Sequence, residues 1–298
     1  MILQECYTLP NGVTVPKLGL GTWFIDDDKA AKAVRDAVKV GYRLIDTAQA
    51  YGNERGVGEG VRTCGLPREE LFVTSKVAAE AKTYEEAARS IDETLTKMGL
   101  EYLDLMIIHS PQPWAEFREE NRYFAENKEV WRALEDAYAA GKLRAIGVSN
   151  FYPHTLTNFC ETVRIKPMVN QIETHPFFVQ KEAMATMEFY HVVPEAWSPL
   201  GGGRYKAFDN ETLKKIADAH NKTIGQVMLR WNVQRGVVVI PKSTHVERIK
   251  ENADIFDFTL TDEEMNEITA LDMGYEGTAI KHFDPEFVRM CVRRNIHD

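Results

Sequence analysis

The stretch GYRLIDTAQAYGNE, residues 41–54, begins as a buried β-strand and ends as a polar turn. The apolar pair Leu44-Ile45 is followed directly by Asp46, and Tyr51 comes five positions later. On its own, this pattern also fits a carboxylate that caps a helix and a tyrosine that packs in a core. A functional interpretation requires that other strands of the chain end in the same way.

Short apolar runs of this kind recur along the whole chain. Each is too short for a helix and too continuously apolar for a half-exposed strand, which is typical of parallel strands buried on both faces. The eight runs cover residues 18–22, 43–47, 71–76, 104–109, 144–150, 167–173, 192–198 and 237–242.

Helical patterns with clear start signals lie between these runs. The capping-box sequence TYEE at 83–86 predicts a helix that stops at Gly99, and TDEE at 261–264 predicts the start of a last helix. Asn127 precedes another helical pattern, which ends before Gly141. Alternating strands and helices without a low-complexity linker predict one domain over residues 1–298, a single (β/α)8 TIM barrel.

A doubly wound sheet is the competing fold. It would place Gly-x-Gly-x-x-Gly between its first strand and helix. GLGTWF (19–24) has the first two of these glycines but lacks the third. GVGEG (56–60) has the wrong spacing and lies inside a helical pattern. Both sets are therefore expected to permit close backbone packing, and Asn11-Gly12 predicts a β-hairpin ahead of the barrel.

Composition excludes several classes of protein. The chain has 298 residues, 44% of them hydrophobic, and a net charge of −9, which argues against nucleic acid or an anionic membrane as a partner. No apolar run reaches the ~20 residues of a membrane span, and the N-terminus lacks the pattern of a signal peptide. The four cysteines are scattered, which favours free thiols in a reducing cytoplasm. A cytoplasmic monomer is the expectation.

Polar side chains close seven of the eight apolar runs. In a (β/α)8 barrel the active site lies at the C-terminal ends of the strands, so these side chains are expected to converge on one mouth. Individually, Asp46 fits a helix cap, Lys76 a solvated lysine and His109 a core histidine. Together they predict a site; the closing residues are Asp46, Lys76, His109, Ser149-Asn150, Gln171, Trp197-Ser198 and Lys242-Ser243.

The residue types in this set indicate carbonyl chemistry. Lysine is no metal ligand and no His-Glu-x-x-His occurs, so no metal is expected. A phenol such as Tyr51 has a pKa near ~10, which the Lys76 ammonium is expected to lower while Asp46 anchors that ammonium. His109 is placed to polarise a carbonyl oxygen. Because no side chain delivers hydride, a cofactor must.

Several blocks of the sequence resemble the aldo-keto reductases. The regions 41–58, 100–111 and 240–252 are similar to the three signature regions of that family, and shorter blocks follow in the family's order. The likeness runs from about residue 8 to the C-terminus. It implies a barrel that binds NADP(H) without a Rossmann domain and a catalytic tetrad of Asp46, Tyr51, Lys76 and His109. The phrases EAWSPLGGG and NADIFDF most resemble bacterial enzymes of the 2,5-diketogluconate reductase type.

The same resemblance assigns residues to the cofactor. It implies that the nicotinamide carboxamide binds Ser149, Asn150 and Gln171, that Trp197 stacks on the ring, and that Ser198 and Leu200 belong to the same site. It places Lys242, Ser243 and Arg248 around the adenosine 2′-phosphate, and Glu251 with Asn252 on the adenine side. Apart from the resemblance, Lys242 and Arg248 also fit ordinary surface charges.

The expected substrate pocket departs from the pattern of the family. Trp23 matches a pocket tryptophan, although a core role also fits it. Two further tryptophans of many members are replaced by Ala78 and Ser110, and Trp114 lies close enough to fill part of that space. A wider, more polar mouth is therefore expected, one that suits small dicarbonyls and sugar-derived carbonyls.

These observations predict an NADPH-dependent reductase of aldehydes and ketones with Tyr51 as the general acid. Two alternatives stay open. Lys76 could act as a Schiff-base nucleophile in an aldolase-type lyase, or the chain could be a non-catalytic NADPH-binding regulatory subunit.

Overall fold

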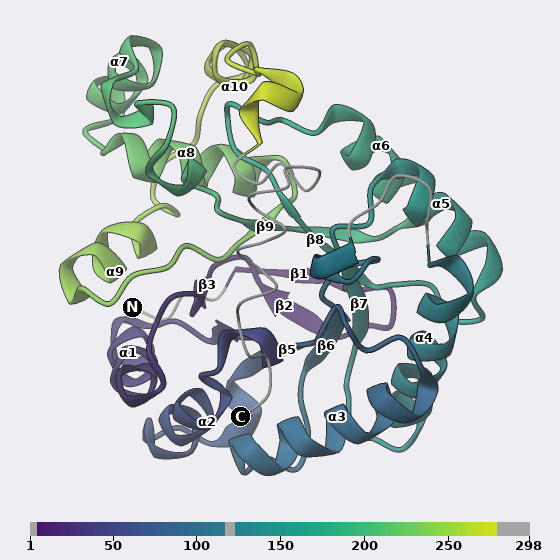
Figure 1. Cartoon of the computed structure of the whole chain (residues 1–298). Coiled ribbons are helices and arrows are strands. Elements are labelled where there is room, and N and C mark those ends of the chain that lie inside the picture. Colours follow the sequence, from purple (N-terminus) through teal and green to yellow (C-terminus); the bar gives the residue numbers. More distant parts are fainter. Residues whose placement is uncertain (1–4, 117–122, 279–298) are drawn as a thin grey trace.

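Eight short parallel strands form a ring at the centre of the molecule, with helices around its outside (Figure 1). The computed structural model describes residues 5–116 and 123–278. Each strand pairs with the next one in the chain, so the ring follows the sequence. The strands are β3 Gly19–Gly21, β4 Leu44–Asp46, β5 Phe72–Val77, β6 Leu105–Ile108, β7 Ile146–Ser149, β8 Val169–Glu173, β9 Val193–Trp197 and β10 Val238–Val239. The predicted (β/α)8 barrel is confirmed.

The ring closes where the first strand meets the last. Leu18 and Val239 form a parallel bridge, and the Val239 amide donates to the Lys17 carbonyl oxygen at 2.9 Å. The Gly21 amide donates to the Pro241 carbonyl oxygen at 3.2 Å. A Cβ on Gly21 would lie 2.6 Å from the Ile240 carbonyl oxygen, so this seam requires glycine.

Helices follow every strand and shield the ring from solvent. The predicted capping boxes at Thr83 and Thr261 are both present, and Gly99 ends its helix with a φ of 64°. A third capping box, at Thr223, starts α8. The helices are α1 Asp27–Val40, α2 Glu54–Thr63, α3 Tyr84–Met98, α4 Phe124–Ala139, α5 Pro153–Thr162, α6 Lys181–Tyr190, α7 Glu211–His220, α8 Ile224–Gln234, α9 Val246–Ala253 and α10 Asp262–Thr269.

The prediction that Asn127 precedes the fourth helix is wrong. Helix α4 begins at Phe124, and Asn127 lies inside its first turn. The Asn127 side chain is buried, donates from Nδ2 to the Pro111 carbonyl oxygen at 2.9 Å and accepts from Lys82 Nζ at 3.0 Å. Asparagine is a common cap, but here its amide joins the helix to two loops instead.

The glycines of the GVGEG stretch allow α2 to pack closely on its neighbours. A Cβ on Gly56 would lie 2.0 Å from the Asp27 carbonyl oxygen, and one on Gly58 would lie 2.2 Å from the Met98 carbonyl oxygen. A Cβ on Gly60 would meet Val34 at 2.6 Å. The expectation that these glycines serve packing rather than phosphate binding therefore agrees with the geometry.

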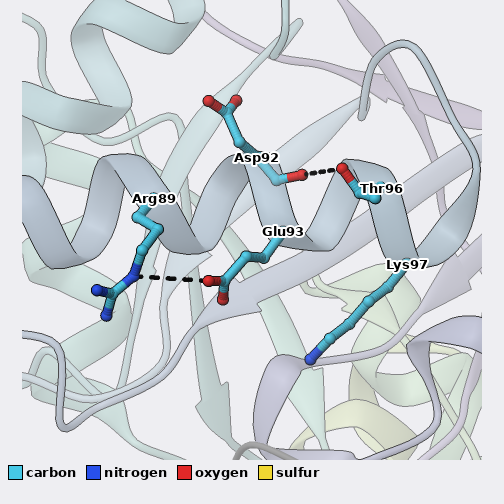
Figure 2. Close-up of a pocket in the computed structure, with 5 residues that line it drawn as sticks. All are labelled: Arg89, Asp92, Glu93, Thr96 and Lys97. Carbon is cyan, nitrogen blue, oxygen red and sulfur yellow. Dashed lines mark hydrogen bonds and ion pairs between the residues drawn. The ribbon is translucent and has the colours of Figure 1, made fainter.

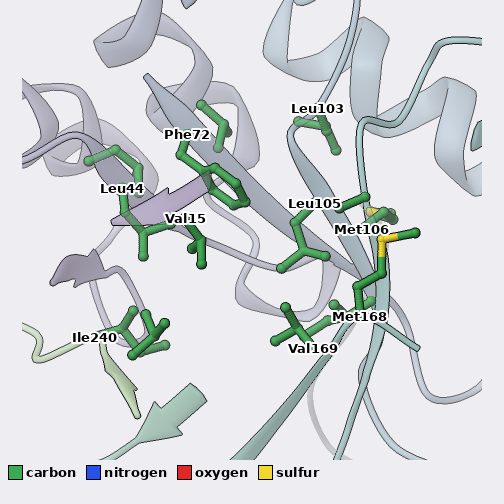
Figure 3. Packing of buried hydrophobic residues seen from close by; sticks show 14 of the residues in the cluster. Val15, Leu44, Phe72, Leu103, Leu105, Met106, Met168, Val169 and Ile240 are labelled. Atoms are coloured by element: carbon green, nitrogen blue, oxygen red, sulfur yellow. The ribbon is translucent and has the colours of Figure 1, made fainter. Parts of the chain in front are cut away.

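The predicted hairpin is present and lies against the barrel. Strands β1 Cys6–Thr8 and β2 Thr14–Pro16 pair antiparallel around a turn in which Gly12 has a φ of 86°. The fully buried Val15 packs beside Leu44 and Leu105 of the barrel strands (Figure 3). This contact plugs the ring at the N-terminal end of its strands and leaves the opposite end for a site.

Other expectations concern what the chain lacks. No helix within 5–116 and 123–278 is long and apolar enough to cross a membrane. The same residues contain no cluster of three metal-ligating side chains. Cys6, Cys64 and Cys160 are free, and Cys291 lies outside the described residues.

Candidate active site

A buried ion pair forms the base of the barrel mouth. Lys76, near the end of β5, is 0% exposed, and its Nζ donates to Asp46 Oδ1 at 2.7 Å and Oδ2 at 2.8 Å. It also donates to the Thr47 carbonyl oxygen at 2.8 Å. Burial alone would lower the pKa of the ammonium, but Asp46 and then Tyr51 more than offset this and the pKa is raised. Lys76 is therefore held charged.

The Lys76 ammonium also contacts Tyr51. Tyr51 lies in the 3₁₀ turn η1, Gln49–Tyr51, and Lys76 Nζ donates to its hydroxyl oxygen at 3.3 Å. Lys76 pulls the pKa of the phenol downward, as expected from the sequence, but burial has the larger effect and the pKa is raised. The expected net lowering is thus wrong for this structure, because desolvation opposes the phenolate more than the ammonium favours it.

His109 faces the same group from the next strand. Its ring meets that of Tyr51 edge-on with centroids 5.6 Å apart, and it meets the Trp114 ring edge-on at 5.5 Å. Burial, with the nearby Lys76 charge, places the pKa of this imidazole well below its usual range. His109 is therefore neutral at physiological pH, and it can donate one N–H to a carbonyl oxygen.

Three polar side chains continue the rim beyond His109. The Asn150 amide Nδ2 donates to the His109 carbonyl oxygen and to Ser149 Oγ, both at 3.0 Å. The Trp197 indole Nε1 donates to Asn150 Oδ1 at 3.0 Å. Ser149, Asn150 and Trp197, all expected at the nicotinamide end, thus lie in one hydrogen-bonded series. Ser198 and Leu200 follow on the partly buried segment after β9.

Gln171 connects this rim with the ion pair. Its amide Nε2 donates to Asp46 Oδ2 at 2.9 Å and to Glu195 Oε1 at 2.6 Å. Glu195 is fully buried, and sequence reasoning missed it. A charged residue two positions before Trp197 in an apolar strand was the available signal, because alternate strand residues share a face.

The loop that carries Tyr51 is held in place by Asn53, which belongs to the polar turn at the end of the 41–54 stretch. Asn53 is fully buried, and its Nδ2 donates to the carbonyl oxygens of Thr22 and Ile25, both at 2.9 Å. Its Oδ1 accepts from Thr47 Oγ1 at 2.7 Å. These bonds join the loop after β3 to the loop after β4, so the phenol is held on a rigid support.

The expected phosphate residues follow β10. Lys242 and Arg248 are both exposed. Lys29 and, more weakly, Lys242 lower the pKa of the Asp26 carboxyl group. Ser243 is buried, and its Oγ accepts from the His245 amide at 3.1 Å at the start of α9. These two exposed cations fit a phosphate group.

The residues expected on the adenine side lie on α9, in the same region. Glu251 is exposed and accepts from Thr223 Oγ1 at 2.7 Å, whereas Asn252 is buried. Glu251 thus joins α9 to the start of α8, whereas Tyr51 lies in the 3₁₀ turn η1.

The expected pocket residues divide into two groups. Trp23 and Trp114 are partly exposed on either side of Tyr51 and His109, and the Trp23 and Tyr51 rings are 6.5 Å apart. Ala78 and Ser110 are 1% and 0% exposed, so they lie behind the surface of the mouth.

A separate surface hollow lies on the outer face of α3 (Figure 2). All of its lining residues are exposed and come from this one helix: Arg89, Asp92, Glu93, Thr96 and Lys97. It lies outside the ring, whereas the ion pair of Lys76 and Asp46 lies inside it, so we assign no chemistry to this hollow.

A barrel with a buried lysine–aspartate pair, a tyrosine and a neutral histidine at its C-terminal mouth is the architecture of a carbonyl oxidoreductase. The sequence profile of the aldo/keto reductase family matches residues 17–273. Glyoxal reductase of Bacillus subtilis is 47% identical over 270 residues, which are 90% of this chain and 93% of that protein. The 9,11-endoperoxide prostaglandin H2 reductase of Trypanosoma cruzi is 45% identical over 269 residues, 90% and 91% of the two chains.

A solved structure gives the same result. An aldo-keto reductase from Bombyx mori in complex with NADP has a TM-score of 0.84 and 33% identity, covering 94% of this chain and 96% of that one. The chain belongs to the aldo/keto reductase family. It is an oxidoreductase, which confirms the resemblance at the level of the family; the 2,5-diketogluconate reductase branch stays a prediction.

Proposed function

We propose that Asp46, Tyr51, Lys76 and His109 form the catalytic tetrad of an NADP(H)-dependent reductase of aldehydes and ketones. The chain reduces carbonyl groups with NADPH. The observation that carries the residue assignment is the Lys76 ammonium, which contacts both Asp46 oxygens and the Tyr51 hydroxyl while a neutral imidazole lies beside the same phenol.

Each of the four residues has a separate role. When bound, NADPH supplies hydride to the carbonyl carbon. Tyr51 donates its proton to the carbonyl oxygen, and its raised pKa keeps that proton in place until negative charge develops on the oxygen. Lys76 stabilises the phenolate that is left, Asp46 keeps the ammonium charged, and His109 donates an N–H to the carbonyl oxygen.

The residues present fit this cofactor. Lys242 and Arg248 offer two exposed cations, which suits a 2′-phosphate. Ser149, Asn150 and Gln171 offer amide and hydroxyl groups beside the tetrad, which suits a carboxamide. Trp197 offers a flat aromatic face in the same rim. Ser198, Leu200, Ser243, Glu251 and Asn252 complete the proposed cofactor site.

The proposed substrates are small dicarbonyls and sugar-derived carbonyls. Glyoxal reductase among the relatives supports the first class. Trp23 and Trp114 are the aromatic walls on the exposed side of the mouth, whereas Ala78 and Ser110 are enclosed and do not line it. We place the enzyme in the cytoplasm as a monomer without a nucleic-acid partner, in keeping with its free thiols and net charge of −9.

The two alternatives are not supported. A Schiff-base lysine must present a neutral amine to the substrate, but Lys76 is 0% exposed and bonded to Asp46 and Thr47. A purely regulatory subunit has no need of the intact tetrad geometry.

Replacement of Tyr51 tests the proposal. Tyr51→Phe keeps the ring and removes the acid, so we expect kcat for methylglyoxal to fall by ~10²–10⁴-fold, measured by NADPH absorbance, with NADPH affinity unchanged. Tyr84→Phe, at a surface tyrosine that bonds Asp136, is the matched control and should retain activity. A Tyr51→Phe enzyme that keeps most of its kcat contradicts the assignment.

A further inference from the structure

Glu195 is a buried carboxyl group that the proposed reaction does not use. It lies on β9 directly opposite Gln171 of β8, and its side chain is completely shielded from solvent. Its Oε1 accepts from Gln171, whereas its Oε2 has no hydrogen-bond partner within the described residues. Burial of a carboxyl group lowers the stability of the folded protein by several kcal/mol unless the group is paired. Stability therefore does not explain the presence of Glu195.

The Gln171 amide is fully engaged on its nitrogen side. A primary amide has two N–H donors, and here they go to Asp46 Oδ2 at 2.9 Å and Glu195 Oε1 at 2.6 Å. The reversed amide would point its carbonyl oxygen at two carboxyl groups, which is repulsive unless both are protonated. The two carboxyl groups therefore fix the orientation of the amide and leave only its carbonyl oxygen to bind a ligand.

The charges around Glu195 favour this arrangement over a direct ion pair. Asp46 from β4 and Lys76 from β5 face the carboxyl group, and Tyr51 lies within their field. The Lys76 ammonium already donates to Asp46, Thr47 and Tyr51. Burial, followed by the Asp46 carboxylate, raises the pKa of Glu195 to about 8. At neutral pH the group thus serves Gln171 as an acceptor without adding a full charge beside the tetrad.

We propose that Glu195 is a positioning residue for the cofactor, which holds the Gln171 amide with its carbonyl oxygen directed to the nicotinamide carboxamide. The carboxamide carries an NH₂ group, which needs an acceptor of this kind. The inference rests on the proposed role of Gln171 in binding the nicotinamide. It adds a residue of β9 to the site that acts only through its neighbour.

Binding measurements with two ligands test this role. NADPH carries the nicotinamide, whereas 2′-phospho-ADP-ribose has the same phosphates and adenine without it. Glu195→Met removes the acceptor at similar volume, and Glu195→Gln keeps an acceptor oxygen. We expect Glu195→Met to weaken NADPH by about 3- to 10-fold, the worth of one hydrogen bond, with 2′-phospho-ADP-ribose unaffected, and Glu195→Gln to restore NADPH binding. Affinity is read from quenching of tryptophan fluorescence.

The outcomes separate this inference from the proposed function. If Gln171→Ala leaves NADPH affinity unchanged, the assignment of Gln171 to the nicotinamide fails, and the inference fails with it. If Gln171→Ala weakens NADPH but Glu195→Met does not, Gln171 binds the cofactor without help from Glu195, and only the inference is overturned. Equal loss of both ligands in Glu195→Met would show a general structural role and would also overturn it.

Discussion

Lys76 and Arg248 show how surroundings decide what a positive charge does. Lys76 is enclosed, and its three donors are used by Asp46, Thr47 and Tyr51. Its charge is fixed in place and acts on the phenol. Arg248 is exposed to solvent. Its planar, permanently charged group is suited to bind a phosphate from solvent.

Arg248 provides a prediction on cofactor choice. Arg248→Ala should weaken NADPH by roughly 10- to 100-fold, because a charge-assisted hydrogen bond contributes about 1.5–3 kcal/mol. NADH, which lacks the 2′-phosphate, should bind as before. Both affinities can be measured by fluorescence titration, with Arg89→Ala on the outer face of α3 as the matched control (Figure 2). Equal losses for NADPH and NADH would assign Arg248 a structural role.

Glu195 provides a prediction on stability and pH. Its pKa is about 8 in the folded protein and near ~4.3 in an unfolded chain. Between these values the folded state holds a proton that the unfolded state has lost, so stability falls as pH rises, by up to about 1.4 kcal/mol per pH unit. Glu195→Gln removes this titration. We therefore expect the free energy of unfolding in urea of Glu195→Gln, relative to that of the wild type, to increase from pH 5 to pH 8. If this difference does not change with pH, Glu195 does not titrate with a raised pKa in the folded protein.

Among secondary-structure elements, the sequence predicts those that depend on local signals. The capping boxes at Thr83 and Thr261 and the stop at Gly99 are satisfied within one helical turn, and their predictions are confirmed. Asn127 carries an equally plausible start signal, but its amide is used by Pro111 and Lys82, which only the folded chain brings near. No local pattern contains that information.

The same division applies to the candidate site. Residues that end strands could be found from the order of strands alone, because a barrel brings all strand ends to one mouth. The contacts of Gln171 with Asp46 and Glu195 join three strands, and the hydrogen bonds of Asn53 join two loops. The net effect of burial on the pKa of Tyr51 also depends on the packed structure. These features arise only when the chain is folded.

Two glycines in different helices give a matched prediction on packing. Alanine normally stabilises a helix relative to glycine by about 1 kcal/mol. At Gly58 of α2 the new Cβ would lie 2.2 Å from the Met98 backbone oxygen, whereas at Gly225 of α8 the nearest atom is 3.7 Å away. We expect Gly58→Ala to lower the thermal unfolding temperature and Gly225→Ala to keep or raise it. A stable Gly58→Ala protein would mean that α2 can move away from α3.

On the scale of the whole molecule, the site draws on every part of the barrel. The proposed tetrad comes from the strands and loops β4 to β6, and the proposed cofactor residues come from β7 to β10 and α9. The cofactor is thus proposed to bind mainly the second half of the barrel. It stabilises the whole barrel against unfolding only if both halves unfold together.

This dependence predicts the effect of the cofactor on unfolding. NADPH at ~100 times its dissociation constant should add about 2.7 kcal/mol to the free energy of unfolding, which corresponds to a rise of roughly 5 °C. The single domain proposed for residues 1–298 should show one transition in differential scanning calorimetry, shifted as a unit. Two transitions, of which only one responds to NADPH, would divide the chain.

The seam between β3 and β10 has a consequence for biosynthesis. The first strand of the ring finds its second neighbour only when the last strand has been made, and Tyr42 similarly bonds the carbonyl oxygen of Ile249, 207 residues further along. At ~5–20 residues per second, a ribosome needs roughly 10–40 s to supply that partner. During this interval the nascent chain carries an open strand edge at β3, which invites pairing with other chains. A chaperone that covers this edge would therefore protect the nascent chain until β10 has been made.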